Sequence, residues 1–267
     1  MRNLLFLLCF LATTAHAADA VDRAIADLEQ CTTVEDAVCQ AAPGRIAVWG
    51  SEAVPRLMKV FAELPAAGQI LAVGALGRID EPAATQALVQ LGGAKSSSVR
   101  AVVLETLGGR SGAQVEKVLI AGLTAKEPTV RAAAAESLGK SNSLRDLKRV
   151  IPALARVCAD TSEQVAVSAV ESLGLIGDPR AVPSLLGALR SPRSSVRRAA
   201  LFSARMIRDP RVISPLIELL LDVDASTVAD AAHALSHLTQ RQFGADYKVW
   251  KNWWVEVGGK LPEGPEP

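Results

Sequence analysis

The sequence predicts an all-α fold, a right-handed α-solenoid of about six two-helix repeats with a helical cap at each end. Two observations carry this prediction. A segment of about eleven residues recurs at a near-constant spacing, and a proline-containing apolar segment precedes several of its copies. The composition agrees, because 49% of the residues are hydrophobic but only 4% are aromatic. This apolar content is mostly Ala, Leu and Val, which suits close packing between helices.

The recurring segment is interpreted as the second helix of each repeat. Its clearest copies read VRAVVLETLGG, VRAAAAESLGK and VAVSAVESLGL. Consecutive copies start 31, 31, 35, 31 and 32 residues apart, at Gly68, Val99, Val130, Val165, Val196 and Val228. A fixed period of this length is typical of helical-repeat proteins.

The first helix of each repeat is expected upstream of these copies. A Val/Ile-Pro-x-Leu pattern begins at Val54, Ile151 and Val182, with a variant at Ile213. Proline is tolerated near a helix start, because the first N–H groups have no partner within the helix. Four Leu-Gly pairs are expected to end second helices, with their glycines at Gly77, Gly108, Gly139 and Gly174. A helix pair of this size must stack on its neighbours to bury its apolar face.

These units resemble HEAT repeats, in particular the short class also found in phycobilin lyases. The resemblance rests on the Val-Pro-x-Leu-Leu and Val-Arg-x-x-Ala-x-x-x-Leu-Gly patterns and covers about residues 50–240. It implies a helical-repeat array. It says almost nothing about function, because such arrays serve many roles.

The repeat array is expected to span residues 50–240, between two caps. Residues 18–49 are predicted to form an N-terminal helical cap. Residues 241–258 are predicted to form a capping helix in which Tyr247, Trp250 and Trp254 share one face. We interpret this face as closing the core of the last repeat, and an exposed aromatic patch for a partner is the alternative. Residues 259–267 are expected to form a disordered tail.

The N-terminus predicts export from the cytoplasm. Arg2 precedes an apolar run from Leu4 to Ala12, and Ala15-His16-Ala17 offers the small-x-small pattern of a cleavage site. The run is shorter than the roughly 20 residues that a membrane-spanning helix needs. Residues 1–17 are therefore interpreted as a signal peptide, and the mature chain is expected in the periplasm or outside the cell.

The mature chain carries no charge excess. Loss of Arg2 leaves 28 basic and 28 acidic side chains. A nucleic-acid-binding protein needs a positive field, and so does a protein that docks electrostatically on anionic lipids. We therefore expect neither kind of partner, and no membrane insertion after signal cleavage.

The cysteines fit an oxidising compartment. Cys31 and Cys39 are predicted to form a disulfide if Thr32 to Glu35 acts as a capping box that opens a new helix between them. Unpaired buried thiols are the alternative. Cys158 aligns with leucines of later repeats, which indicates a buried, inert thiol.

No catalytic motif or cofactor-binding motif is recognised, so the chain is not expected to be an enzyme. His233 and His237 lie one helical turn apart, a spacing that occurs in metal sites. However, His233 aligns with Leu104 and Val170 at a largely inward position. Deoxyhypusine hydroxylase, an enzyme with similar architecture, holds iron through His-Glu motifs, and this sequence has no His-Glu pair.

Two sets of charged residues recur in the second helices. Arg100, Arg131 and Arg197 share one position, where we expect them to tie neighbouring turns together, with ligand contact as the alternative. Three glutamates share another position and are predicted to lie beside small residues on the inner, concave surface. The predicted partner-binding residues are Glu105, Glu136, Glu171, Ala101, Ala132 and Val167.

The sequence thus favours a non-catalytic, monomeric scaffold or adaptor of the bacterial cell envelope that binds a protein partner. In the first alternative, it is a structural subunit of an envelope complex without a selective ligand, and the glutamates are a solvated face. A lyase-like HEAT-repeat enzyme is the second alternative.

Overall fold

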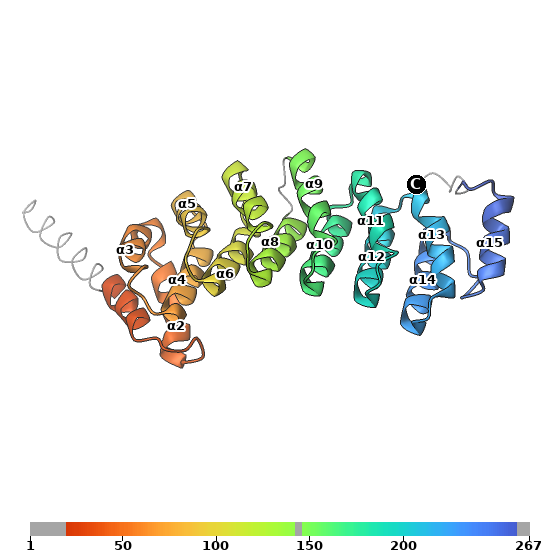
Figure 1. The fold of residues 1–267 in the computed structure, drawn as a ribbon. Helices are drawn as coiled ribbons and strands as arrows, with labels where there is room; N and C mark the ends of the chain where they lie inside the picture. The colour runs from red at the N-terminus through yellow and green to blue at the C-terminus, as the bar shows by residue number, and fades with distance from the viewer. Residues whose placement is uncertain (1–19, 142–145, 261–267) are drawn as a thin grey trace, which may run out of the picture. The chain divides into compact units, whose positions relative to one another are not determined.

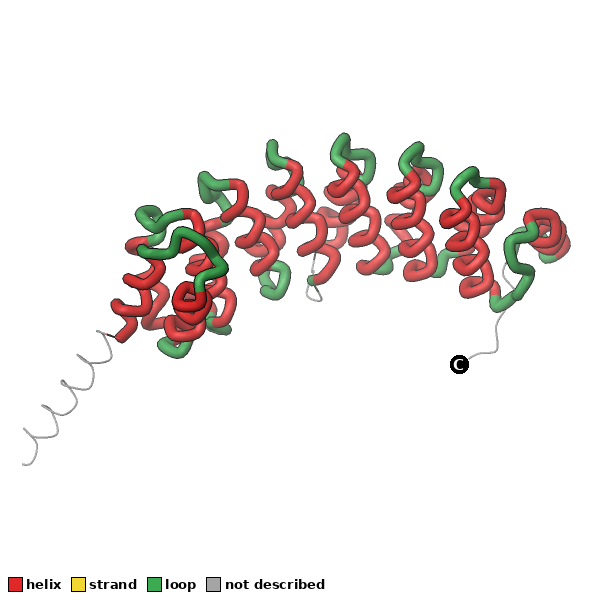
Figure 2. The backbone as a smooth tube through the Cα atoms, turned by 90° about the horizontal axis from the view of Figure 1, so that it is seen from below, coloured by secondary structure: helices red, strands yellow, loops and turns green. Residues whose placement is uncertain are grey.

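The computed structural model describes residues 20–141 and 146–260. Within these residues every regular element is an α-helix or a short 3-10 helix, as Figure 2 shows, so the predicted all-α class is confirmed. The proposed signal peptide, residues 1–17, and most of the proposed tail lie outside the described residues. The chain divides into two compact units, Met1–Arg110 and Ser111–Pro267.

The first unit contains the N-terminal cap and the first repeats. A helix over residues 20–29 is followed by α2 (Ala37–Ala47), the 3-10 helix η1 (Gly50–Glu52), α3 (Ala53–Val60), α4 (Ala66–Arg78), α5 (Pro82–Leu91) and α6 (Ser97–Leu107). The second helix α4 packs between α2 and α6, whereas the first helices α3 and α5 contact each other (Figure 1). This unit therefore has the two-layer arrangement of a repeat stack.

The second unit continues the same arrangement. Its elements are α7 (Ala113–Gly122), α8 (Pro128–Lys140), α9 (Leu147–Val157), α10 (Glu163–Ile176), η2 (Pro179–Ala181), α11 (Val182–Ala188), α12 (Ser194–Ile207), η3 (Pro210–Val212), α13 (Ile213–Glu218), η4 (Leu219–Leu221), α14 (Ala225–Thr239) and α15 (Tyr247–Glu256). The second helices α8, α10, α12 and α14 pack side by side in that order (Figure 1). We call their exposed surface the second-helix face.

In α14, the second helix of the last repeat, Thr227 and not Val228 occupies the position of Val196, which corrects the predicted alignment. Thr227 is fully buried, whereas Val228 is partly exposed. The Thr227 hydroxyl donates to Asp224 Oδ2 over 2.7 Å, so its polar atom is satisfied in the interior. The spacing from Val196 is therefore 31 residues. His233 moves to an exposed position, and its predicted inward placement was wrong.

The Leu-Gly pairs lie within two residues of the helix ends, as predicted, and three of the four glycines also mark close contacts between helices. Gly108 is the C-cap of α6, whereas Gly77, Gly139 and Gly174 lie in the last three residues of α4, α8 and α10. A methyl group on Gly139 would lie 2.5 Å from Ser172 Oγ, and one on Gly174 would lie 2.5 Å from Ser203 Oγ. Each serine hydroxyl in turn donates over 2.8 Å to a carbonyl of the preceding second helix.

Gly174→Ala should therefore destabilise the second unit. Inserting a methyl group into a packed interior costs about 1–3 kcal/mol. The matched control is Gly187→Ala, because Gly187 also lies in a helix but a methyl group there meets nothing within 4 Å. This control should be neutral or gain up to about 1 kcal/mol from helix propensity. Urea unfolding followed by circular dichroism measures both, and equal midpoints would contradict the close contact.

The predicted disulfide is present in the N-terminal cap. Cys31 and Cys39 are bonded, with their Cα atoms 5.8 Å apart. The predicted capping box is wrong, because α2 begins at Ala37. Asp36 is its N-cap residue and accepts hydrogen bonds from the backbone N–H groups of Val38 and Cys39. The disulfide thus joins the end of the first described helix to the first turn of α2.

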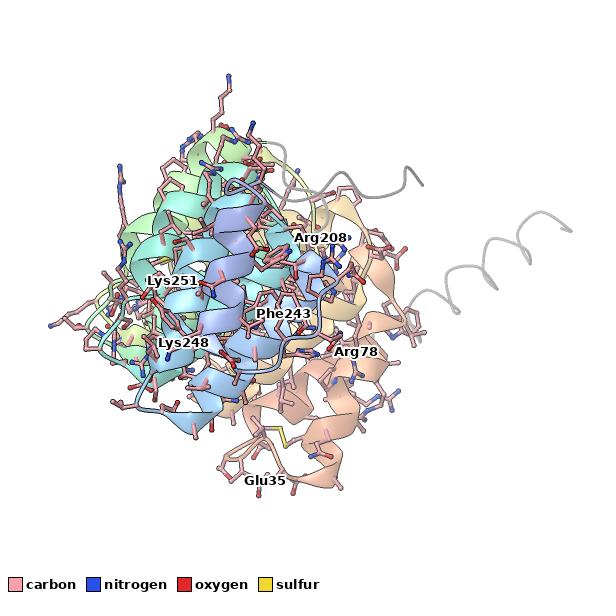
Figure 3. The ribbon with its side chains drawn as sticks, turned by 90° about the vertical axis from the view of Figure 1, so that its right-hand side faces the viewer. Glu35, Arg78, Arg208, Phe243, Lys248 and Lys251 are labelled. Carbon is pink, nitrogen blue, oxygen red and sulfur yellow. A yellow bond between two sulfur atoms is a disulfide. The ribbon has the colours of Figure 1, made fainter. Side chains whose placement is uncertain are left out.

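The C-terminal helix α15 covers the last repeat with two tryptophans. Trp250 is fully buried and Trp253 nearly so, and Phe243 packs edge-on against Trp250 with ring centroids 4.8 Å apart. The Trp250 indole N–H donates to Gly244 O over 2.8 Å. Figure 3 shows Phe243 in the preceding loop. The buried face therefore includes Trp253, whereas the predicted Trp254 is partly exposed.

Candidate partner-binding face

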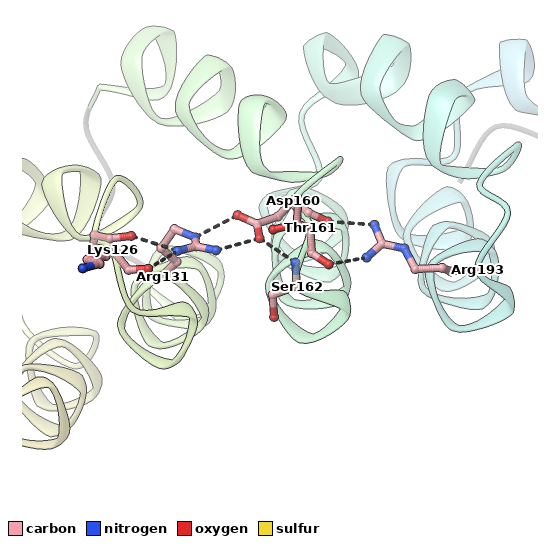
Figure 4. A network of polar contacts seen from close by, with 7 residues as sticks. Lys126, Arg131, Asp160, Thr161, Ser162 and Arg193 are labelled. Carbon is pink, nitrogen blue, oxygen red and sulfur yellow. Dashed lines mark hydrogen bonds and ion pairs between the residues drawn. The ribbon is translucent and has the colours of Figure 1, made fainter.

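The aligned arginines hold loops at the edge of the repeats. Arg131 donates over 2.8 Å to both carboxylate oxygens of Asp160, and to the Lys126 carbonyl in its own loop. Asp160 also receives the Ser162 N–H, and its backbone carbonyl accepts from Arg193 (Figure 4). The Arg131 guanidinium holds the pKa of Asp160 below its usual range. This network joins the loops of three consecutive repeats.

Arg197 and Arg100 occupy the same position and make similar contacts. Arg197 donates to the Ser191 carbonyl over 2.9 Å and pairs with Asp222, whose side chain is equally buried. Arg100 donates over 3.0 Å to the Ala94 carbonyl in its own loop. The geometry is what the proposed stitching role requires. Since Arg131 and Arg197 are largely buried and paired, they leave little surface for a ligand.

The aligned glutamates differ from one another in their surroundings. Glu136 on α8 accepts from Ser168 over 3.1 Å and lies 3.5 Å from Lys140. Burial raises the pKa of Glu171 on α10, and the neighbouring Glu136 carboxylate raises it further. These two carboxylates therefore act on each other across adjacent helices. Glu105 is exposed on α6 in the first unit.

The small residues beside the glutamates do not form a uniform strip. Ala101 and Val167 are partly exposed, but Ala132 is only 2% exposed. Ala132 therefore offers no side-chain surface to a partner. The open space that the sequence suggested beside the glutamates is absent at this position of the described structure.

A hollow of about 440 Å³ lies on the second-helix face across α10, α12 and α14. We call it the α12 groove, and its main side chains are those of Glu171, Arg198, Phe202, Arg205, Asp230 and His233. Glu171, Phe202 and His233 occupy the same repeat position, six residues after Val165, Val196 and Thr227. The groove was not predicted from the sequence, because alignment of the last repeat on Val228 placed His233 in the interior.

Positive groups gather where α12 and α14 approach each other. His237 has its pKa lowered by burial, and further by the charges of Arg205, Arg208 and His233. Figure 3 labels Arg208, which follows the last turn of α12. Among the described residues, no group of three or more His, Cys, Asp and Glu side chains is placed to hold a metal ion.

His237 should titrate below the usual histidine pKa of about 6.5. Because the folded chain binds this proton less readily than the unfolded chain, stability should fall as the pH drops below about 6.5. Proton NMR of the imidazole ring measures the pKa directly. Arg205→Gln should raise it by removing a nearby positive charge, whereas Arg156→Gln, on α9, should not change it. Identical values in all three proteins would show that the arginine charge does not reach His237.

Cys158 is a buried thiol at the end of α9. Burial raises its pKa to about 12. Its Sγ lies 3.5 Å from the Leu154 carbonyl. A thiol with this pKa is almost entirely protonated near neutral pH, so it is a poor nucleophile.

A membrane-spanning helix would have to be long and continuously apolar. None of the helices between residues 20 and 260 that the structure describes meets this requirement.

The stacked helix pairs and the face they present define a helical-repeat scaffold. A protein-family model described as HEAT repeats matches residues 91–166 and 151–236, more than half of the chain. The chain belongs to the HEAT-repeat family. No match is found among curated proteins.

Several solved structures are similar in fold. The Escherichia coli protein YibA is 17% identical, with a TM-score of 0.57 and 74% of each chain covered. An engineered protein is 20% identical over 90% of this chain and 72% of its own, with a TM-score of 0.51. The CpcE–CpcF complex of phycocyanin lyase from Nostoc sp. is 24% identical over 57% of this chain and 98% of that chain, with a TM-score of 0.47. A likeness at this level of identity concerns the fold and gives no information about activity.

Proposed function

We propose that this chain is a non-catalytic, monomeric scaffold or adaptor of the bacterial cell envelope that binds a protein partner on its second-helix face. The observation that carries the proposal is the α12 groove together with the neighbouring carboxylates of Glu136 and Glu171. These side chains lie on rigid helices and provide charge of both signs. A surface of this kind is suited to recognising a folded or extended protein segment.

Two features support a location in the envelope. The Cys31–Cys39 disulfide is typical of a protein from an oxidising compartment. The sequence of residues 1–17 has the pattern of a cleaved signal peptide. Mass spectrometry of the protein isolated from the periplasmic fraction should find a new N-terminus near Ala18 and no free thiol at Cys31 or Cys39.

The partner-binding role can be tested by crosslinking capture from the native envelope. A triple variant replaces Glu105, Glu136 and Glu171 by Ala. The control replaces three exposed glutamates that lie off this position, Glu29, Glu63 and Glu256. We expect one specific partner to be recovered with the unchanged protein and the control, and to be lost with the triple variant.

Other results would redirect the assignment. If no protein is enriched over an unrelated exported bait, the chain acts as a structural subunit without a selective ligand. If the partner is retained by the triple variant, the scaffold role stands but the glutamates do not form its binding site.

A further inference from the structure

Arg205 on α12 is partly buried, and its guanidinium keeps an unsatisfied N–H donor in the described structure. Its Nε is shielded from solvent and makes no hydrogen bond. By contrast, Arg110 donates to Asp80 and to three backbone carbonyls, and Arg131 donates to Asp160. A guanidinium N–H removed from water without an acceptor costs free energy, and a ligand carboxylate that paired with Arg205 in the groove would offset part of that cost.

Basic side chains outnumber acidic ones around Arg205 in the described structure. Arg208 and His233 act on the same neighbouring imidazole, that of His237, and all of these groups are basic. Asp230 lies in the groove but already accepts from Arg198 over 2.8 Å. Glu171 also lines the groove, on α10. The C-terminal half of α12 therefore presents more positive than negative charge, with Arg205 and Arg208 beside two histidines.

Apolar side chains flank this positive charge on the same face. Phe202 is 40% exposed and Met206 is 48% exposed, and they lie one turn apart on α12. Leu175 on the adjacent helix α10 is 46% exposed. A free inorganic anion would make no use of such surface. A peptide could cover it with an apolar side chain while placing a carboxylate against Arg205.

We propose that the α12 groove binds an acidic segment of a partner protein, with a carboxylate paired to Arg205 and an adjacent apolar side chain on Phe202 and Met206. Arginine suits this role because its planar fork matches a carboxylate. The inference rests on the proposed scaffold function and deepens it. The partner would carry an acidic residue opposite Arg205 and a basic residue opposite Glu136.

Isothermal titration with short peptides at physiological salt tests the proposal directly. The probe is an acetylated, amidated Gly-Glu-Leu-Glu-Gly peptide, and its matched control has Gln in place of both Glu residues. We expect the acidic peptide to bind and the Gln peptide to bind at least tenfold more weakly. The histidine NMR signals of His233 and His237 should shift with the acidic peptide alone.

Variants assign the binding to the groove. Arg205→Gln should weaken binding of the acidic peptide at least tenfold, Phe202→Ala should weaken it several-fold, and Arg156→Gln should leave it unchanged. Circular dichroism checks that each variant is folded. Arg205→Lys retains the charge without the fork, so it should fall between the parent and Arg205→Gln.

Two outcomes would overturn the proposal. Equal affinity of the parent and Arg205→Gln for the acidic peptide would show that this arginine is not the anchor. If inorganic phosphate binds as tightly as the peptide, the groove is a site for small anions. Neither result bears on the capture experiment, which can still recover a partner through the glutamates of the second-helix face.

Discussion

Trp250→Ala should lower the free energy of unfolding by about 3–5 kcal/mol, the range for truncating a buried Trp. Trp250 is fully buried, packs against Phe243 and Trp253, and donates its indole N–H to Gly244 O. Each repeat in a solenoid is stabilised by its neighbours, so loss of a cap should loosen the last repeat first. Urea unfolding followed by circular dichroism measures the loss.

Trp254→Ala is the matched control, because Trp254 lies on the same helix but is partly exposed. It should cost much less than Trp250→Ala. Hydrogen exchange should show faster exchange in α13 and α14 for Trp250→Ala, with α8 and α10 unchanged. Equal destabilisation by both substitutions would indicate that α15 does not close the core through Trp250.

Arg131→Met should destabilise the second unit by about 2–3 kcal/mol, slightly below the range for breaking a fully buried ion pair. The side chains of Arg131 and Asp160 are only 14% and 10% exposed. Methionine keeps much of the packing but leaves the Asp160 carboxylate without its main partner. Because Arg131 also lowers the pKa of Asp160, the variant should lose less stability relative to the parent at acidic pH.

The exposed pair of Arg180 and Asp178 provides the comparison. Arg180 donates to Asp178 over 2.7 Å but its side chain is half exposed, so Arg180→Met should change stability little. The double variant with Arg131→Met and Asp160→Asn should recover part of the loss, because no uncompensated charge remains. A single variant as stable as the parent would contradict a structural role for this network.

The repeat fold was predictable because its signals are strong and repeated. A period of 31 residues between similar helices constrains the fold more than any single helix pattern can. Finer features depended on tertiary contacts. A Leu-Gly pair is read as a helix end, but the contacts give Gly139 and Gly174 a second role, because a serine of the next helix occupies the space of a side chain. Alignment on valine also placed the last repeat one residue late, since a buried threonine satisfied by Asp224 replaces the valine.

The candidate site was predictable only in part. The recurring glutamates and arginines stand out in an alignment of repeats, and the arginine contacts follow from their shared position. Arg205 has no counterpart in the other repeats, so no pattern singled it out. What marks Arg205 is a buried Nε without a hydrogen-bond acceptor in the described structure, which only three-dimensional contacts reveal. Arg110 was not predicted either, because its role also depends on three-dimensional contacts. It donates to three carbonyls at the end of α4.

The Gly–Ser contacts also bear on how this chain could change in length. The contact between α8 and α10 and the contact between α10 and α12 use the same positions, with the same serine-to-carbonyl hydrogen bond. A duplication of the 31 residues from Val165 would therefore add one more copy of an interface that already exists. Relatives of this protein are then expected to differ by whole helix pairs, and each glycine should change only together with the serine that faces it.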